Sequence, residues 1–81
     1  RVNAVCPGFI QGEWLRDGLG DERYETIKAA REEGAPLGIT VTPKIVADSI
    51  LYFLKSAEGI TGETLMVDGG HHLGGAPLGR R

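Results

Sequence analysis

The sequence lacks the features that usually stabilise a small protein. Only one of its 81 residues is a cysteine, Cys6, so the chain can form no internal disulfide bond. Its two histidines and its cysteine do not have the spacing of zinc ligands. A domain of this size buries only about 60% of its unfolded surface, so we expect the missing stability to come from more protein. The chain starts with Arg1 instead of methionine, and we interpret it as the end of a longer polypeptide.

A strong net charge and long apolar runs are absent too. Nine basic residues against eleven acidic ones give a formal net charge of −2. The longest basic run is the pair Arg80-Arg81, which argues against nucleic acid as a partner because phosphate binding relies on clustered Lys and Arg. No apolar run approaches the roughly 20 residues that cross a bilayer, so we expect no membrane partner. We expect a soluble, cytoplasmic protein, and the lone thiol suits a reducing compartment.

The residues that are present favour strands and helices in alternation. Residues 2–6 are a β-branched apolar run that ends at Pro7-Gly8, a pattern typical of a buried strand. Thr42-Pro43 predicts a helix start, with an N-cap followed by proline at the first helical position. In order, we expect a strand at 2–6, helices near 13–17 and 21–33, a linker at 35–38, a helix at 43–57, a strand near 63–67, and an irregular end whose tail is 71–81.

A strand, then helices, then a second strand is typical of an α/β fold with a parallel sheet. Two strands form only a corner of such a sheet, and both faces of the sheet need cover. The helix expected at 43–57 carries apolar side chains over a wider arc than an ordinary surface helix does. We therefore expect the sheet to cover one side of this helix and a neighbouring subunit to cover the other.

Four segments, taken in order, resemble the short-chain dehydrogenase/reductase family. Residues 1–10 are similar to the family segment R-V-N-x-V-x-P-G-x-I. The other three are the Pro-Leu-Gly linker at 36–38, the helix start at 42–47 and the closing strand at 61–70. No single segment suffices, because Pro-Gly and Asp-Gly-Gly are common turns, but their joint order covers nearly all of residues 1–70.

The resemblance implies the C-terminal part of a Rossmann-type, doubly wound parallel sheet, with residues 1–81 as one segment of a single domain. It also implies an oxidoreductase that transfers a hydride between NAD or NADP and a small-molecule alcohol or carbonyl substrate. The family's catalytic serine, tyrosine and lysine would lie upstream of Arg1, so no catalytic residue is expected in this chain. A homo-oligomer, either dimer or tetramer, is implied as well. The alternative is a non-catalytic module that keeps the fold for binding or subunit association.

The resemblance also assigns the loop after the first strand to the cofactor. The implied cofactor-binding residues are Pro7, Gly8, Phe9, Ile10 and Gly12, with the backbone of Ile10 holding the nicotinamide carboxamide. A loop at the carboxyl end of a parallel strand is where such sheets bind ligands, and Gly8 would let the backbone approach a flat ring. The family often has a threonine where this chain has Gly12, so one hydroxyl contact to the cofactor phosphate is missing. The alternative is that Pro-Gly only ends the strand.

Residues 12–33 match the family's substrate-binding segment, a pair of helices. The large side chains there are Trp14, Leu15, Leu19 and Tyr24. They either shape a substrate pocket or pack the helices against the body of the protein. Tyr24 and Lys28 have the spacing Tyr-x-x-x-Lys, but they follow the Pro-Gly loop, which is the wrong order for the family's catalytic pair. An ordinary helix-surface pair at i, i+4 is the alternative.

Three further polar positions have structural interpretations. The Asn3 amide interrupts an apolar strand, and we expect it to hydrogen-bond neighbouring backbone more readily than to act in catalysis. Asp68 suits the turn after the last strand, which its carboxylate can cap. The adjacent histidines His71 and His72 have no third ligand at suitable spacing, so they favour a tail over a metal site.

Overall fold

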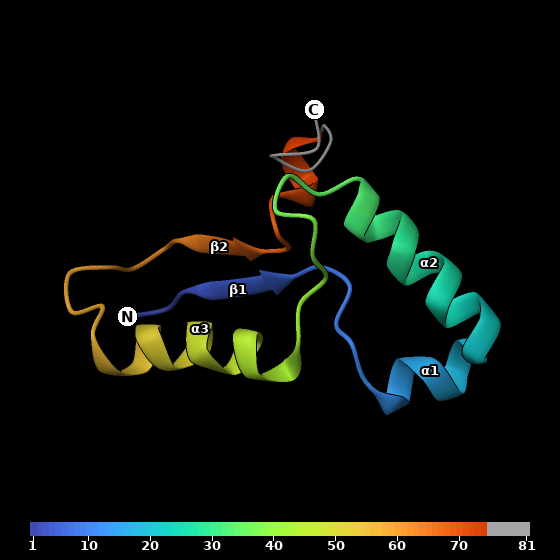
Figure 1. Cartoon of the computed structure of the whole chain (residues 1–81). Helices are drawn as coiled ribbons and strands as arrows, with labels where there is room; N and C mark the ends of the chain where they lie inside the picture. The colour runs from blue at the N-terminus through green and yellow to red at the C-terminus, as the bar shows by residue number, and fades with distance from the viewer. Residues whose placement is uncertain (75–81) are drawn as a thin grey trace.

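The computed structural model describes residues 1–74, and its elements follow the expected order (Figure 1). Residues 75–81 of the expected tail lie outside the described residues. No helix within residues 1–74 is long and apolar enough to cross a membrane. The elements are β1 (Ala4–Pro7), α1 (Glu13–Leu19), α2 (Asp21–Glu33), α3 (Pro43–Lys55), β2 (Thr64–Val67) and the 3-10 helix η1 (His71–Leu73).

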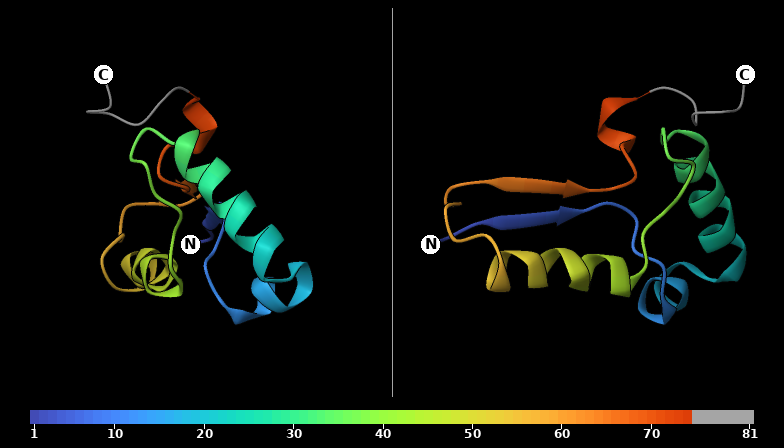
Figure 2. Two further views of the ribbon diagram at one scale, coloured as in Figure 1. Left: turned by 45° about the vertical axis from the view of Figure 1, so that its right-hand side comes forward. Right: turned by 60° about the vertical axis from the view of Figure 1, so that its left-hand side comes forward.

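The two strands pair in parallel, which confirms the expected sheet. Ala4 lies opposite Thr64, and Pro7 lies opposite Val67, so both strands end at the same edge. Helix α3 runs along one face of the pair and contacts both strands (Figure 2). Helices α1 and α2 stand beside the carboxyl end of β1, away from that face (Figures 1 and 2). The carboxyl edge of the sheet therefore faces the helical pair α1 and α2.

Helix α3 begins as the Thr42-Pro43 pattern predicted. The Thr42 hydroxyl accepts a hydrogen bond from the backbone N–H of Ile45 at 3.2 Å, which satisfies one of the helix's unpaired N–H groups. The helix ends at Lys55, two residues before the expected end at 57. Lys44 places a positive charge at the positive end of the helix dipole, and the carboxylate of Asp48 pairs with its ammonium at 2.7 Å.

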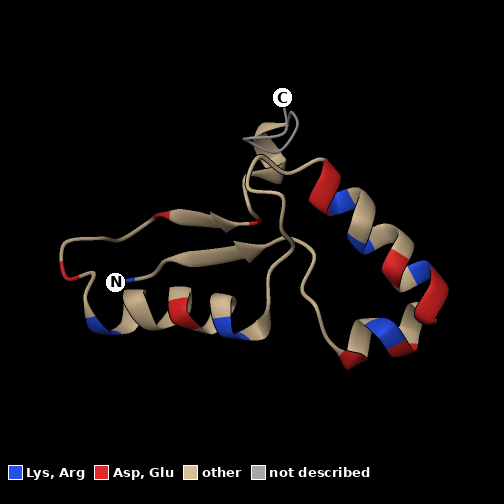
Figure 3. Cartoon of the chain, in the orientation of Figure 1, with Lys and Arg blue, Asp and Glu red and all other residues tan. Residues whose placement is uncertain are grey.

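Helices α1 and α2 differ in how well the sequence predicted them. Helix α2 has the predicted bounds, whereas α1 continues past 17, through Gly18, to Leu19. Gly20 separates the two helices with a positive φ of 84°, which glycine adopts without strain. Acidic and basic residues crowd these two helices and are nearly absent from the strands (Figure 3). Arg16 joins the helices by hydrogen bonds to Asp21 at 3.2 Å and to Glu25 at 2.9 Å.

Asn3 and Asp68 have the structural roles expected of them. The Asn3 amide donates to the carbonyl of Ile60 and accepts from the N–H of Glu63, both at 3.0 Å. The Asp68 carboxylate accepts from the N–H groups of Gly70 at 2.9 Å and His72 at 3.0 Å. The Asp68 turn leads into η1, a short helix that sequence reasoning missed because an irregular end was expected there.

The described residues form a small core with a large apolar surface around it. The buried apolar residues are Tyr24, Ala35, Val41 and Ala57. On α3, Leu54 is 71% exposed, and Leu51 and Tyr52 are exposed too. Phe53 is half-buried and lies with Val5 and Leu54 in a groove beside the sheet. Leu54 is thus the most exposed large apolar residue of α3, although it lines the same groove as Phe53.

Candidate functional site

The loop after β1 is fixed by two backbone hydrogen bonds to Val41. The Gln11 N–H donates to the Val41 carbonyl at 2.8 Å, and the Val41 N–H donates to the Phe9 carbonyl at 3.1 Å. These bonds make a short parallel bridge between Ile10 and Val41. Val41 itself is 1% exposed. The segment between α2 and α3 thus holds the loop at the edge of the sheet where open α/β folds bind ligands.

Ile10, at the centre of this bridge, keeps its own peptide groups unpaired. Its neighbours supply the bonds to Val41, and within residues 1–74 the N–H and C=O of Ile10 make no hydrogen bond. Ile10 as a residue is half-buried, and backbone groups that are buried normally find partners. One donor and one acceptor on the same residue are complementary to a primary amide, which also presents one of each.

A chain of side-chain hydrogen bonds supports the loop from α2. The Gln11 amide donates to the Thr40 hydroxyl at 2.9 Å, and that hydroxyl donates to Glu32 at 2.9 Å. Lys28 also pairs with Glu32, at 2.9 Å. The hydrogen bond from Lys28, with a further one from Thr40, lowers the pKa of Glu32 despite partial desolvation. Lys28 is therefore engaged with Glu32, which favours the surface interpretation of its spacing from Tyr24.

The structure gives a steric reason for glycine at position 8, beside the ring approach that the resemblance implies. Its φ is not positive, so no left-handed conformation requires glycine here. A β-carbon built on Gly8 would lie 2.8 Å from the β-carbon of Asp68 at the end of β2, far closer than carbon atoms pack. Close approach of Gly8 to Asp68 explains the glycine without any ligand ring.

Two grooves meet at this loop. The loop groove has a volume of about 520 Å³, and the helix cleft, between the helical pair and the end of β1, has about 430 Å³. Gly8, Phe9 and Leu15 line both. The other residues of the loop groove are Ile10, Gln11, Gly12, Glu13, Trp14 and Pro43, and those of the helix cleft are Pro7, Leu19, Ile27 and Arg31.

The grooves bring together every predicted site residue except Tyr24. Trp14 is 87% exposed at the side of the loop groove, whereas Tyr24 is 3% exposed and acts in packing. The Tyr24 hydroxyl accepts from the Gly12 N–H at 3.0 Å, and its ring centroid lies 5.3 Å from that of Phe9. The Arg16 guanidinium covers the Tyr24 ring at 4.2 Å. For Tyr24, the packing alternative therefore accounts for its contacts.

Sequence reasoning missed Ile27 and Arg31 in the helix cleft. Both follow Tyr24 at spacings of three and seven residues, which place all three side chains on one face of α2. That spacing was a usable signal, but the many charges of α2 obscured it. Gln11 and Pro43 in the loop groove gave no such signal, because their position depends on the bridge between Ile10 and Val41.

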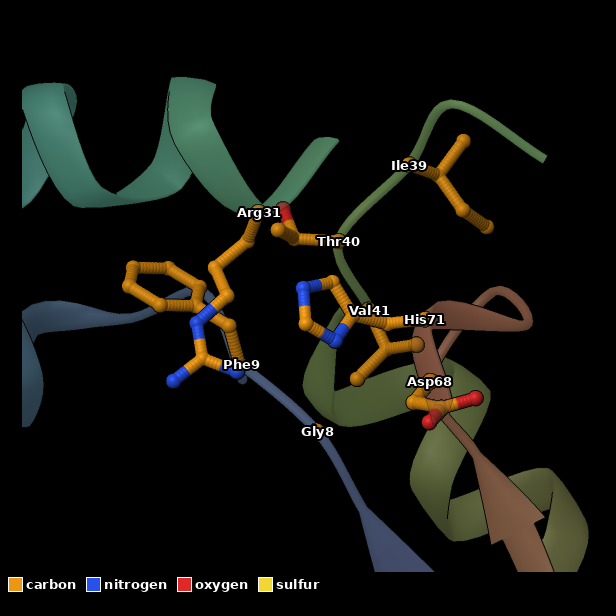
Figure 4. Close-up of a pocket in the computed structure, with 8 residues that line it drawn as sticks. All are labelled: Gly8, Phe9, Arg31, Ile39, Thr40, Val41, Asp68 and His71. Atoms are coloured by element: carbon orange, nitrogen blue, oxygen red, sulfur yellow. The ribbon is translucent and has the colours of Figure 1, made fainter. Parts of the chain in front are cut away.

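A small pocket of about 40 Å³ lies between the loop residues Gly8 and Phe9 and the segment that carries Thr40 and Val41 (Figure 4). Arg31, Thr40, Asp68 and His71 contribute its polar side chains. The ring of His72 pairs with Asp68 at 3.0 Å. Burial of Asp68 opposes its ionisation, but hydrogen bonds from His72 and the Gly70 backbone outweigh it and lower the pKa of Asp68. Within residues 1–74, no three potential metal ligands come together.

The chain matches the family model described as enoyl-(acyl carrier protein) reductase over residues 1–72. It is 42% identical to enoyl-acyl-carrier-protein reductase (NADH) 1 of Rhizobium meliloti, with 93% of this chain and 27% of that protein aligned. It is 41% identical to carbonyl reductase family member 4 of Xenopus laevis, with 90% and 27% aligned. The chain belongs to the short-chain dehydrogenase/reductase family, a family of oxidoreductases.

Solved structures confirm the Rossmann-type α/β fold. The reductase/Diels-Alderase MalC of Malbranchea aurantiaca superposes with a TM-score of 0.81 at 37% identity, covering 90% of this chain and 27% of that one. The aldohexose dehydrogenase of Thermoplasma acidophilum gives a TM-score of 0.77 at 28% identity, covering 100% and 34%. The chain thus spans about a third or less of the proteins that it matches.

The contact between Gly8 and Asp68 predicts a stability effect. We expect Gly8→Ala to lower the free energy of unfolding of the full-length protein by about 1–3 kcal/mol, because the new methyl group must displace Asp68. Gly59→Ala is the matched control, since a β-carbon at Gly59 meets nothing within 4 Å; it should change stability by less than about 0.5 kcal/mol. Urea unfolding measures both, and equal midpoints for the two variants would contradict the steric argument.

Proposed function

We propose that the chain is the C-terminal segment of an oxidoreductase that transfers a hydride between NAD or NADP and a small-molecule alcohol or carbonyl substrate. Membership of the family supports the reaction type, and the name of the Rhizobium relative includes NADH. The family's serine, tyrosine and lysine would lie in the part of the protein that precedes Arg1. In this proposal, the chain binds and orients the two reactants, and the nicotinamide supplies or accepts the hydride.

The main support for a cofactor in the loop groove is the unpaired N–H and C=O of Ile10. They lie on the wall of the loop groove, on a loop whose backbone Val41 fixes on both sides of Ile10. A nicotinamide carboxamide would donate to the Ile10 carbonyl and accept from its N–H, so both groups would gain a partner. Because Val41 already fixes the loop, little conformational entropy is lost when the carboxamide binds.

The helix cleft would then hold the substrate. It adjoins the loop groove through Gly8, Phe9 and Leu15, and its remaining lining is mostly apolar. Trp14 and Leu15 flank the loop groove from α1, and Leu19 lies in the cleft. Such an apolar cleft with few polar groups is typical of small-molecule sites.

A second candidate reaction is hydride transfer to the carbon–carbon double bond of an enoyl thioester. The description of the matched family and the name of the Rhizobium relative favour it. The full-length protein separates the two candidates when NADH or NADPH consumption is followed with a ketone panel and with crotonyl-CoA. Turnover of a ketone supports the first proposal, and turnover of crotonyl-CoA alone supports the second. If neither reacts, the non-catalytic module is favoured.

Gly12 offers a test of the cofactor position. A side chain at Gly12 would enter open space, since a β-carbon built there meets nothing within 4 Å, and we expect Gly12→Thr to add a hydroxyl contact to the cofactor phosphate. One such hydrogen bond corresponds to about a tenfold lower dissociation constant at most. Gly12→Val has nearly the same shape without the hydroxyl and should bind no more tightly than the parent. Cofactor fluorescence titration measures all three proteins, and equal affinities for Thr and Val would contradict the phosphate contact.

The exposed face of α3 supports a homo-oligomer, for which we propose this face as the subunit interface. Leu54, Leu51 and Tyr52 form an apolar surface on α3 that no other part of residues 1–74 covers, and such a surface suits a subunit interface. We expect Leu54→Glu to shift the full-length protein toward monomer in sedimentation velocity, because the interface would bury an unpaired charge. Lys55→Glu, at the neighbouring exposed position, should leave the assembly intact. An unchanged oligomer size for Leu54→Glu would place the interface elsewhere.

A further inference from the structure

Arg31 continues the helix face that carries the apolar side chains Tyr24 and Ile27. Tyr24, Ile27 and Arg31 share that face of α2, and an aliphatic residue would continue the stripe where Arg31 stands. Figure 4 shows the Arg31 side chain extending from α2 toward the loop that carries Gly8 and Phe9. Arg31 lines both the helix cleft and the small pocket beside it.

Arg31 is the one charged residue in the lining of the helix cleft. Its companions there are Pro7, Gly8, Phe9, Leu15, Leu19 and Ile27. Within residues 1–74, Arg31 forms no ion pair. Arg16, Lys28 and Lys44 each pair with a carboxylate, whereas the exposed residues Arg23, Arg31 and Lys55 form no ion pair within residues 1–74. Of these three, Arg31 alone lines the helix cleft. An arginine without a carboxylate partner beside apolar side chains favours an anionic ligand, because guanidinium binds carboxylates through paired hydrogen bonds.

The nearby carboxylates are already engaged with other groups. Glu32 accepts from Lys28 and Thr40, and Asp68 accepts from His72 and from the backbone of its own turn. In Figure 4 the Asp68 oxygens lie on the far side of the His71 ring from the Arg31 guanidinium. Neither acid therefore neutralises Arg31 in the described structure.

We propose that Arg31 binds the carboxylate of an otherwise apolar substrate that occupies the helix cleft. The assignment rests on the proposed function for the cleft, and it narrows the substrate class to oxo or hydroxy acids with an aliphatic chain. The apolar side chains of the cleft bury the chain, and Arg31 fixes the charged end beside Gly8 and Phe9. The small pocket, at about 40 Å³, has room for a group of a few heavy atoms next to Arg31.

Calorimetry of the full-length protein tests whether the cleft prefers a ligand with a negative charge. The probes are octanoate and octanamide, which share an apolar chain and differ in charge. We expect the parent to bind octanoate about tenfold more tightly than octanamide, the factor of one charge-assisted pair. Arg31→Gln should abolish that preference while leaving the octanamide affinity unchanged. Arg23→Gln should keep it, because Arg23 is on the same helix but lines neither the helix cleft nor the small pocket.

Two further results separate this proposal from the proposed function. Arg31→Lys should retain part of the preference, because a lysine keeps the charge but loses the paired geometry. With 7-oxooctanoate and its methyl ester as ketone substrates, Arg31→Gln should raise KM about tenfold for the acid alone. An octanoate preference without turnover of either ketone would contradict the proposed carbonyl reduction and leave the anion site standing. An equal affinity of the parent for octanoate and octanamide, or an unchanged preference in Arg31→Gln, would overturn the anion site.

Discussion

The pairing of Val41 with Phe9 and Gln11 is the interaction on which the rest of the site depends. It joins the end of β1 to the segment between α2 and α3, residues that are far apart in the sequence. Without it, the Pro7–Gly12 loop would be attached to the sheet only at Gly8, whose N–H donates to Val67. Because Val41 is buried, these two hydrogen bonds are shielded from water on its side, which strengthens them.

The helical pair is tied to the same loop through Tyr24. Its hydroxyl bonds the Gly12 N–H, and its ring packs on Phe9. The ion pairs of Arg16 add little to this attachment, because they are solvent-exposed and such pairs contribute about 0–1 kcal/mol each. Tyr24, together with the hydrogen bonds that run from Glu32 through Thr40 to Gln11, therefore ties the helical pair to the loop.

The sequence predicted what local chemistry determines. Thr42-Pro43 gave the start of α3 because capping needs only neighbouring residues, and the role of Asp68 followed from its place in a turn. The sequence did not predict features that depend on contacts between segments far apart in the chain. The reason for Gly8 lies in Asp68, at the end of the other strand, and the role of Arg31 appears only once α2 stands beside β1. The cofactor and substrate positions rested on family resemblance, and they remain proposals.

The two grooves share a wall, and this arrangement suits hydride transfer. The reacting atoms of two bound molecules must approach to about 3–3.5 Å, so the molecules must meet at a common boundary and not in separate cavities. Gly8, Phe9 and Leu15 line both grooves, and at Gly8 that wall is backbone alone. Since Val41 holds the Phe9 carbonyl in place, the same pair of backbone hydrogen bonds would fix a cofactor in the loop groove and a substrate in the helix cleft relative to each other.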